Sequence, residues 1–182
     1  MEAKAEVHHY MQRYIRPARL EDFDAVWDVL QSGRQYLKDQ NLPQWQTGCG
    51  PREEEIKARL QAEESYVLVL DGIISGYTAL VPEPDGSPPM SEGAWAMCDT
   101  PYVAIHRVAL GENCRGKGHA GGFLRDMVTI AGALGYRDIR IDTHPDNVIM
   151  QKVIEQAGFI KCGVMEKGVP GGTRWAYQIV LR

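Results

Sequence analysis

The sequence lacks the features of several large protein classes. No window of it holds the roughly 18 successive apolar residues that a membrane-spanning helix needs. Its N-terminal segment has no apolar stretch of the kind found in a secretory signal peptide. The formal net charge is -4, so there is no positive excess to attract nucleic acid or anionic lipid. We therefore expect a cytoplasmic protein that binds neither membranes nor nucleic acid.

Cysteine is scarce, and its spacing suits neither disulfides nor a metal. Cys49, Cys98, Cys114 and Cys162 form no C-x-x-C pair, and none belongs to a Cys/His group at zinc spacing. We therefore expect reduced thiols and no metal site.

Length and composition fit one folded domain. The chain has 182 residues, which is enough to bury a substantial core. Hydrophobic residues make up 44% and charged residues 24%, and these ordinary values argue against a largely disordered chain. We expect a single domain over residues 1–182, with residues 1–11 as a flexible N-terminal segment.

Hydrophobic periodicity predicts an α/β fold in the order β-α-α-β-β-β-α-β-α-β-β. Asp71 and Gly72 form a favoured two-residue hairpin turn between two of the strands. Residues 82–100 contain four prolines and are expected to be irregular. Strands are predicted at residues 13–16, 66–70, 73–81, 102–110, 138–142, 159–165 and 175–181, and helices at about 23–30, 53–62, 117–134 and 147–157.

Residues 111–122, GENCRGKGHAGG, are rich in glycine and follow a predicted strand. A P-loop would need Ser or Thr after Lys117 to ligate magnesium, but that position is Gly118. A dinucleotide fingerprint would begin where the strand ends, whereas residues 111–115 intervene and too few strands follow. A helix that begins inside such a turn offers open amides and partial positive charge, which suits a pyrophosphate bound without metal. An ordinary glycine-rich turn is the alternative.

Residues 115–120 (RGKGHA) match the pattern R/Q-x-x-G-x-G/A after a strand. The sequence here resembles the GCN5-related N-acetyltransferases (GNAT superfamily), in which this pattern binds the pyrophosphate of acetyl-CoA. The segments RPA, HRVAL, DNVIMQKVIEQAGF and WAYQIVL extend the resemblance over nearly the whole chain. IHRVAL, IDTHPDN and QWQ are similar to segments of bacterial members. The resemblance implies a mixed sheet of six to seven strands flanked by about four helices.

The resemblance also implies how acetyl-CoA, the acyl donor, would bind. The fourth and fifth strands, at 102–110 and 138–142, would splay apart and admit the pantetheine arm between them. Backbone groups of Val108 and Leu110 would bind that arm and polarise the thioester carbonyl, while Asn147 would contact the arm or cap its helix. The implied cofactor-binding residues are Val108, Ala109, Leu110, Arg115, Gly116, Lys117, Gly118, His119, Ala120, Gly121 and Asn147.

Two histidines are candidates for the base that deprotonates the acceptor amine. His106 lies two residues before Val108, so we expect both side chains on the same strand face. By its spacing from Arg115, it resembles a histidine that assists catalysis in serotonin N-acetyltransferase. His144 is the second candidate, and a structural role is the alternative for both. Many members carry a Tyr acid seven residues after the Asn, but Ile154 stands there.

The acceptor pocket is expected to be formed by Tyr36, Trp45, Gln46 and Trp95, although local core packing is the alternative for these side chains. The implied function is acetyl-CoA-dependent N-acetyltransfer to a primary amine of a small molecule or peptide, by direct attack in a ternary complex. The alternative is a non-catalytic acyl-CoA sensor, because the tyrosine acid is missing. The resemblance also allows a homodimer.

Overall fold

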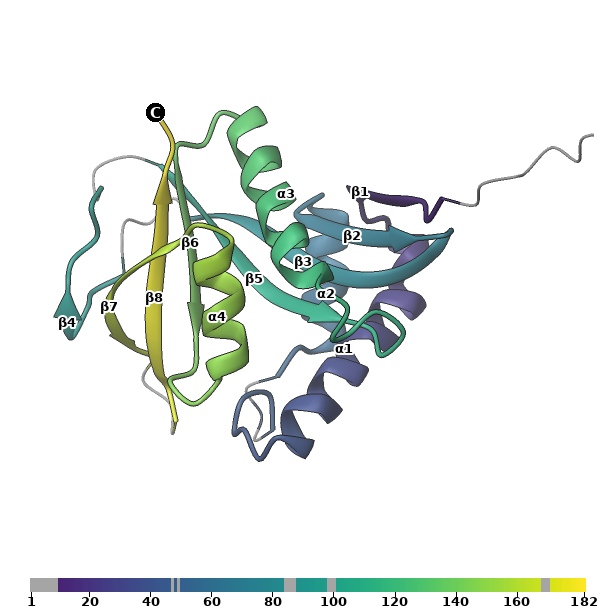
Figure 1. The fold of residues 1–182 in the computed structure, drawn as a ribbon, viewed down its shortest axis with the longest axis horizontal. Coiled ribbons are helices and arrows are strands. Elements are labelled where there is room, and N and C mark those ends of the chain that lie inside the picture. Colours follow the sequence, from purple (N-terminus) through teal and green to yellow (C-terminus); the bar gives the residue numbers. More distant parts are fainter. Residues whose placement is uncertain (1–9, 47, 49, 84–87, 98–100, 168–170) are drawn as a thin grey trace, which may run out of the picture.

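A computed structural model describes residues 10–46, 48, 50–83, 88–97, 101–167 and 171–182 (Figure 1). The predicted flexible segment 1–11 therefore lies almost entirely outside the described residues. In chain order the elements are β1 (Arg13–Pro17), the short 3-10 helix η1 (Leu20–Asp22), α1 (Phe23–Asp39), α2 (Glu53–Gln61), β2 (Ser65–Leu70), β3 (Ile73–Glu83), β4 (Glu92–Gly93), β5 (Tyr102–Leu110), α3 (His119–Ala133), β6 (Asp138–Thr143), α4 (Val148–Gln156), β7 (Ile160–Glu166) and β8 (Thr173–Val180).

The described strands form one mixed sheet in the order β1-β2-β3-β5-β6-β8-β7-β4. Only β5 and β6 run parallel among these neighbours; the other pairs are antiparallel. The α/β class is confirmed, but the expected count of six to seven strands is too low, since the sheet has eight. The extra strand, β4, is only two residues long, and it pairs with the edge strand β7 through Glu92 and Gly93. Two residues are too few to show alternation in the sequence.

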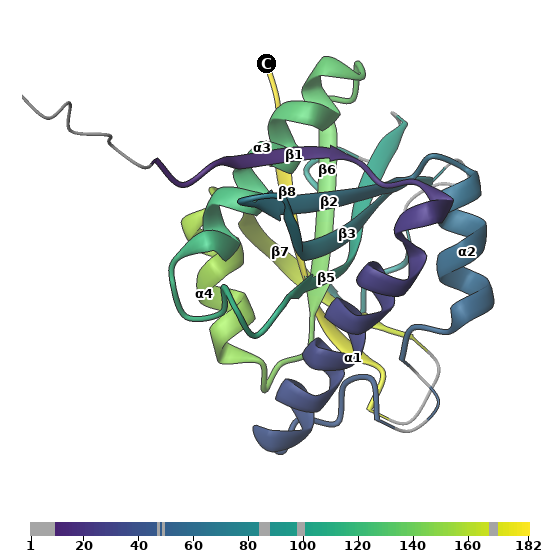
Figure 2. The same ribbon diagram turned by 90° about the vertical axis from the view of Figure 1, so that its right-hand side faces the viewer.

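The helices cover both faces of the sheet (Figure 2). On one face, α3 and α4 bury Phe123, Met127 and Ile154 in a core with the central strands. On the other, α1 and α2 bury Leu30 and Ile56 in a second core. Within the described ranges, no helix has both the length and the apolar character needed to cross a bilayer.

Helix α1 continues to Asp39, well beyond the predicted end near residue 30. Gly33 weakens the helical pattern in the sequence, but in the structure it allows close packing. A β-carbon at this position would lie 3.3 Å from both the Ala109 Cβ and the Trp45 ring. The missing side chain therefore lets α1 approach β5.

The hairpin between β2 and β3 forms as predicted, with positive φ angles of 48° at Asp71 and 81° at Gly72. The expected separation of the parallel strands is also confirmed. The β5–β6 register begins at Tyr102–Asp138 and ends at Ile105–Ile141, although β5 continues to Leu110. The strands diverge there because β6 stays paired with β8 to its last residue. A gap thus opens near the middle of the sheet.

Candidate active site

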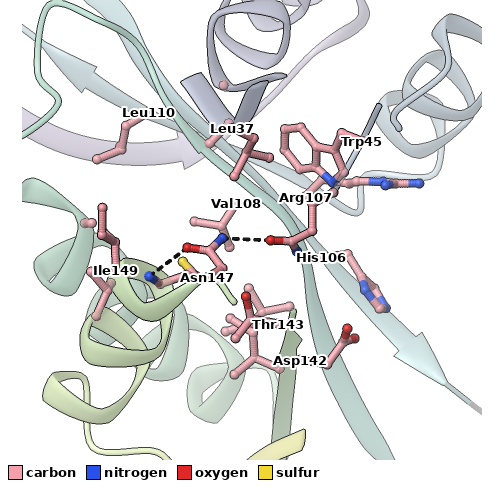
Figure 3. Close-up of a pocket in the computed structure, with 18 of the residues that line it drawn as sticks. Leu37, Trp45, His106, Arg107, Val108, Leu110, Asp142, Thr143, Asn147 and Ile149 are labelled. Atoms are coloured by element: carbon pink, nitrogen blue, oxygen red, sulfur yellow. Dashed lines mark hydrogen bonds between the residues drawn. The ribbon is translucent and has the colours of Figure 1, made fainter. Parts of the chain in front are cut away.

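A cavity of about 890 Å³ occupies the gap between β5 and β6 (Figure 3). Its walls come from α1, β5, the glycine-rich turn, α3, β6 and α4. In Figure 3, Leu110 and Ile149 lie on one side of the view, while His106 and Asp142 lie on the other. This central cavity therefore connects the glycine-rich turn with a group of titratable side chains.

The glycine-rich turn leaves the N-terminus of α3 open. The N-cap is Gly118 at φ 80°, which has no side chain to accept hydrogen bonds from the first helical turn. Gly116 also has a positive φ, of 76°, and among the described atoms a β-carbon at either glycine would meet nothing within 4 Å. The first turn of α3 carries no acidic side chain in the described structure. The free amides and the helix dipole therefore form a site suited to an anion.

Arg115 ties this turn to α1. Its Nη2 donates hydrogen bonds to Ser32 Oγ at 2.7 Å and to Leu110 O at 2.9 Å, and its guanidinium stacks on the Tyr36 ring at 4.5 Å.

Of the predicted cofactor-binding residues, all of which are described, every one except Lys117 lines the cavity. Lys117 Nζ instead donates to Asn113 O at 2.8 Å.

A β-bulge interrupts β5 beside the cavity. Thr78 of β3 faces two residues, Arg107 and Val108, because the register passes from Ala79–His106 to Tyr77–Ala109. Arg107 has a φ of 57°, a conformation that costs a non-glycine residue about 1–2 kcal/mol.

Two contacts hold the bulge in place. Glu55 accepts two hydrogen bonds from the Arg107 guanidinium, at 3.1 and 3.0 Å, and Thr78 Oγ1 donates to His106 O at 3.0 Å. Burial raises the pKa of Glu55, but the positive charges of Arg107 and Arg59 outweigh it and leave that pKa below its ordinary value. Glu55 thus remains ionised and bound to Arg107.

The bulge corrects the prediction that His106 and Val108 share a strand face. Ile105 and Val108 both pack toward the core under α3 and α4, whereas Ala109 belongs to the core under α1 and α2. His106 pairs with Ala79 and therefore faces the side of α1 and α2. Both His106 and Val108 still line the cavity, because the cavity lies in the gap between the strands.

Glu83 is the partner of His106, and inspection of the sequence missed it. His106 Nε2 lies 3.4 Å from Glu83 Oε1, and this hydrogen bond lowers the pKa of the Glu83 carboxyl. Both side chains line the cavity. Only the β3–β5 register brings them together, and a long connection between two strands does not specify a register.

His144 occupies a different environment. It is buried and lies outside the described lining of the cavity, and its Nδ1 accepts a hydrogen bond from the Asp146 amide at 3.1 Å. Its carbonyl accepts hydrogen bonds from the Asn147 amide and from Gln151 Nε2. These contacts brace the turn between β6 and α4.

Burial lowers the pKa of His144 below its ordinary value, although Asp146 partly opposes the shift. The unfolded chain takes up a proton at this residue below about pH 6.5, whereas the folded protein resists doing so. We therefore expect stability to fall as the pH drops below about 6.5, down to the lowered pKa of the folded state. Urea unfolding of His144→Asn should show a shallower fall than the wild type over this range. Equal slopes would contradict the assignment.

The acceptor candidates divide into two pairs. Tyr36 and Trp45 line the central cavity, whereas Gln46 and Trp95 lie outside its described lining. Gln46 Nε2 donates to two backbone carbonyls, at 3.1 and 3.0 Å. The Trp95 ring stacks on the Arg140 guanidinium at 4.1 Å, in a group remote from the cavity.

Asn147 caps α4, as predicted, since its Oδ1 accepts a hydrogen bond from the Met150 amide at 3.1 Å. Its Nδ2 donates to Gln44 Oε1 at 2.8 Å, so it also links α4 to the loop that follows α1 (Figure 3). Gln44 lines the cavity, and its neighbour Trp45 has a φ of 64°. The early QWQ segment, residues 44–46, therefore borders the cavity through Gln44 and Trp45.

A charged group formed by Asp142, Lys167 and Arg174 completes the lining near His106. Asp142 Oδ1 lies 2.9 Å from Lys167 Nζ, and its Oδ2 lies 3.6 Å from Arg174 Nε. Sequence inspection had considered neither cation, because they come from the last two strands and their connection. The splay of β5 and β6 exposes this group to the cavity.

Comparison with known proteins identifies the family. Residues 30–159 match the Acetyltransferase (GNAT) family, and no curated protein matches the sequence. The chain therefore belongs to the GNAT family and is an N-acetyltransferase.

Three solved structures illustrate the shared fold. A GNAT-family acetyltransferase from Streptococcus agalactiae 2603 is 26% identical, with a TM-score of 0.80 over 95% of this chain and 98% of that one. Another from Listeria monocytogenes 4b F2365 is 16% identical, with a TM-score of 0.69 over 93% and 95%. AAC(6')-Ib in complex with ribostamycin and coenzyme A is 19% identical, with a TM-score of 0.68 over 92% and 93%.

Proposed function

We propose that this enzyme transfers the acetyl group of acetyl-CoA to a primary amine of a small molecule or peptide, with both substrates bound together. The observation that carries the proposal is the continuity of the central cavity. It runs from the open N-terminus of α3, through the gap beside Val108, to the His106–Glu83 pair. The complex of a structural neighbour with ribostamycin and coenzyme A supports a small amine as acceptor and CoA as part of the donor.

The residues of the cavity fit acetyl-CoA, which supplies the acetyl group as a thioester. Gly116, Gly118 and the first amides of α3 would hold the pyrophosphate, because no side chain fills that space in the described structure. Past Ile105, β5 has no register with β6, so its backbone on that side is open to the pantetheine arm. Asn147 lies where it can contact the same arm.

We assign the stabilisation of negative charge on the thioester oxygen to the backbone amide of Val108. This amide belongs to the bulge, which Glu55 and Thr78 hold through Arg107 and the His106 carbonyl. A donor that is fixed before reaction needs no reorganisation when charge develops, and such preorganisation is usually a large term in catalysis.

We assign the removal of the amine proton to His106. When Nε2–H donates to Glu83, Nδ1 retains the lone pair that accepts a proton. Glu83 would then stabilise the positive charge on the ring. Glu83 also favours an acceptor that arrives as an ammonium ion, while Tyr36 and Trp45 supply aromatic walls.

Thermal unfolding and a turnover panel together test the proposal. We expect acetyl-CoA and CoA to raise the unfolding temperature without magnesium. At least one class among aminoglycosides, amino acids, polyamines and peptide N-termini should cause amine-dependent release of CoA, measured with a thiol reagent. No thermal shift with any acyl-CoA would contradict the donor assignment. Binding of acetyl-CoA without CoA release across the panel would favour the acyl-CoA sensor instead.

A further inference from the structure

Thr143, the last residue of β6, carries a hydroxyl that the fold leaves unused. The residue is 1% exposed, and within the described structure its Oγ1 has no hydrogen-bond partner. It lines the central cavity, and Figure 3 places it with Val108 and Asn147 around the middle of that space. A buried hydroxyl without a partner is destabilising. Its position beside a substrate cavity indicates that a bound ligand supplies the missing hydrogen-bond partner.

Strand geometry shows which part of the cavity the Thr143 hydroxyl faces. Thr143 lies two residues after Ile141, so it shares the strand face that packs toward α3 and α4. Val108 faces the same side because of the bulge in β5. Thr143 and Val108 therefore border the gap from its two sides, at the level where the β5–β6 register has ended.

Most side chains on the α4 wall of the cavity are apolar, although Asn147 and Gln156 also line it. Met150 and Val153 line the cavity there, and Ile154 is fully buried behind them. Sulfur is the least polar of the atoms that react in a thioester, and it fits such a wall. The carbonyl oxygen of the same group is directed to the β5 backbone in the proposed mechanism, which leaves the sulfur to the β6 side.

We propose that Thr143 donates a hydrogen bond to the thioester sulfur of the bound acyl-CoA and stabilises the leaving thiolate; this rests on the proposed function. In the step, the bond from the amine nitrogen to the acetyl carbon forms and the carbon–sulfur bond breaks. The electron pair of the broken bond stays on sulfur. An acceptor that arrives as an ammonium ion loses its first proton to solvent through His106, and His106 takes the second proton as the new bond forms. Thr143 keeps its own proton throughout, and the thiolate is protonated by solvent after release.

The test compares Thr143→Val, which keeps the shape and removes the hydroxyl, with Thr143→Ser, which keeps the hydroxyl. Loss of a hydrogen bond to a developing charge should lower kcat of Thr143→Val about 10- to 100-fold. Its Kd for acetyl-CoA should stay within about 3-fold of the wild type, because the bond strengthens only as charge develops. Thr143→Ser should retain kcat within about 5-fold, since its hydroxyl makes the same bond.

Thermal unfolding of the free proteins separates this role from a structural one. Removal of an unpartnered hydroxyl should leave the Tm of Thr143→Val unchanged or higher, whereas removal of a hydroxyl held by an internal partner would lower it. Wild-type kcat in Thr143→Val, or a joint loss of Tm and acetyl-CoA affinity, would overturn the inference. If Thr143→Val does not fold, Thr143→Ala replaces it in the same comparison. A wild-type protein that transfers no acetyl group would overturn the proposed function and this inference together.

Discussion

Gly118→Val is expected to abolish the thermal stabilisation of the protein by acetyl-CoA. At about 100 times its Kd, the ligand should raise the Tm of the wild type by roughly 5–10 °C. In the variant, the new side chain projects from the N-cap of α3, where Gly118 has a φ of 80° and meets no described atom within 4 Å. It would occupy the space that the pyrophosphate needs. We expect a remaining shift of about 1 °C or less, measured by thermal unfolding with and without acetyl-CoA.

Gly135→Val provides a matched control at the other end of α3. Gly135 also has a positive φ, of 94°, and a β-carbon there would again meet no described atom within 4 Å. Valine is strained in this conformation at either site, so both variants should lose similar intrinsic stability. Only Gly118→Val should lose the response to acetyl-CoA. A full shift in Gly118→Val would place the anion site away from the helix N-terminus.

His106→Ala is expected to lower kcat by about 10²- to 10³-fold while leaving acetyl-CoA affinity nearly unchanged. The His106 side chain faces α1 and α2. Acetyl-CoA is assigned instead to the part of β5 beyond Ile105 that has no register with β6, on the side of α3 and α4. Removing the histidine therefore removes a proton acceptor and no donor contact. Steady-state turnover with the best amine of the panel, together with a binding measurement for acetyl-CoA, checks both parts.

The choice of amine and a second variant sharpen this test. An amine of low pKa arrives already deprotonated, so the loss in His106→Ala should shrink with such an acceptor. Glu83→Gln keeps the shape of the partner and removes its charge, so its kcat should lie between those of the wild type and His106→Ala. Equal turnover of His106→Ala and wild type over the accessible pH range would exclude His106 as the base.

The features predicted correctly from the sequence are local along the chain. The strand, the turn and the helix start are contiguous in the sequence, so their order alone indicated an open helix N-terminus within the turn, and the structure has it at Gly118. The hairpin at Asp71 and Gly72 is equally local, since those two residues are among the few that adopt the left-handed conformation readily. The cap at Asn147 follows from its side chain and its position before an apolar helical pattern.

The features that the sequence did not predict depend on distant contacts. The bulge that turns His106 away from Val108 is held by Glu55, which lies 52 residues from Arg107 in the chain. Alternation along β5 suggested a shared face because an extra residue in a strand carries no signal of its own. Glu83 and Thr143 were likewise unremarkable in the sequence.

The chain thus encodes its family, its α/β order and the glycine turn in short stretches of residues. The α/β order and the glycine turn depend on backbone conformations that are set by residues close together in the sequence. The arrangement that we propose for catalysis has a different origin, because β5 and β6 separate where β6 stays paired with β8, and His106 meets Glu83 only through the β3–β5 register. Packing between distant segments selects these geometries, and it also isolates the Thr143 hydroxyl. This is why the open helix N-terminus, which we propose holds the pyrophosphate, could be predicted from residues 111–122 alone, whereas the groups proposed to move protons and stabilise the leaving sulfur could not.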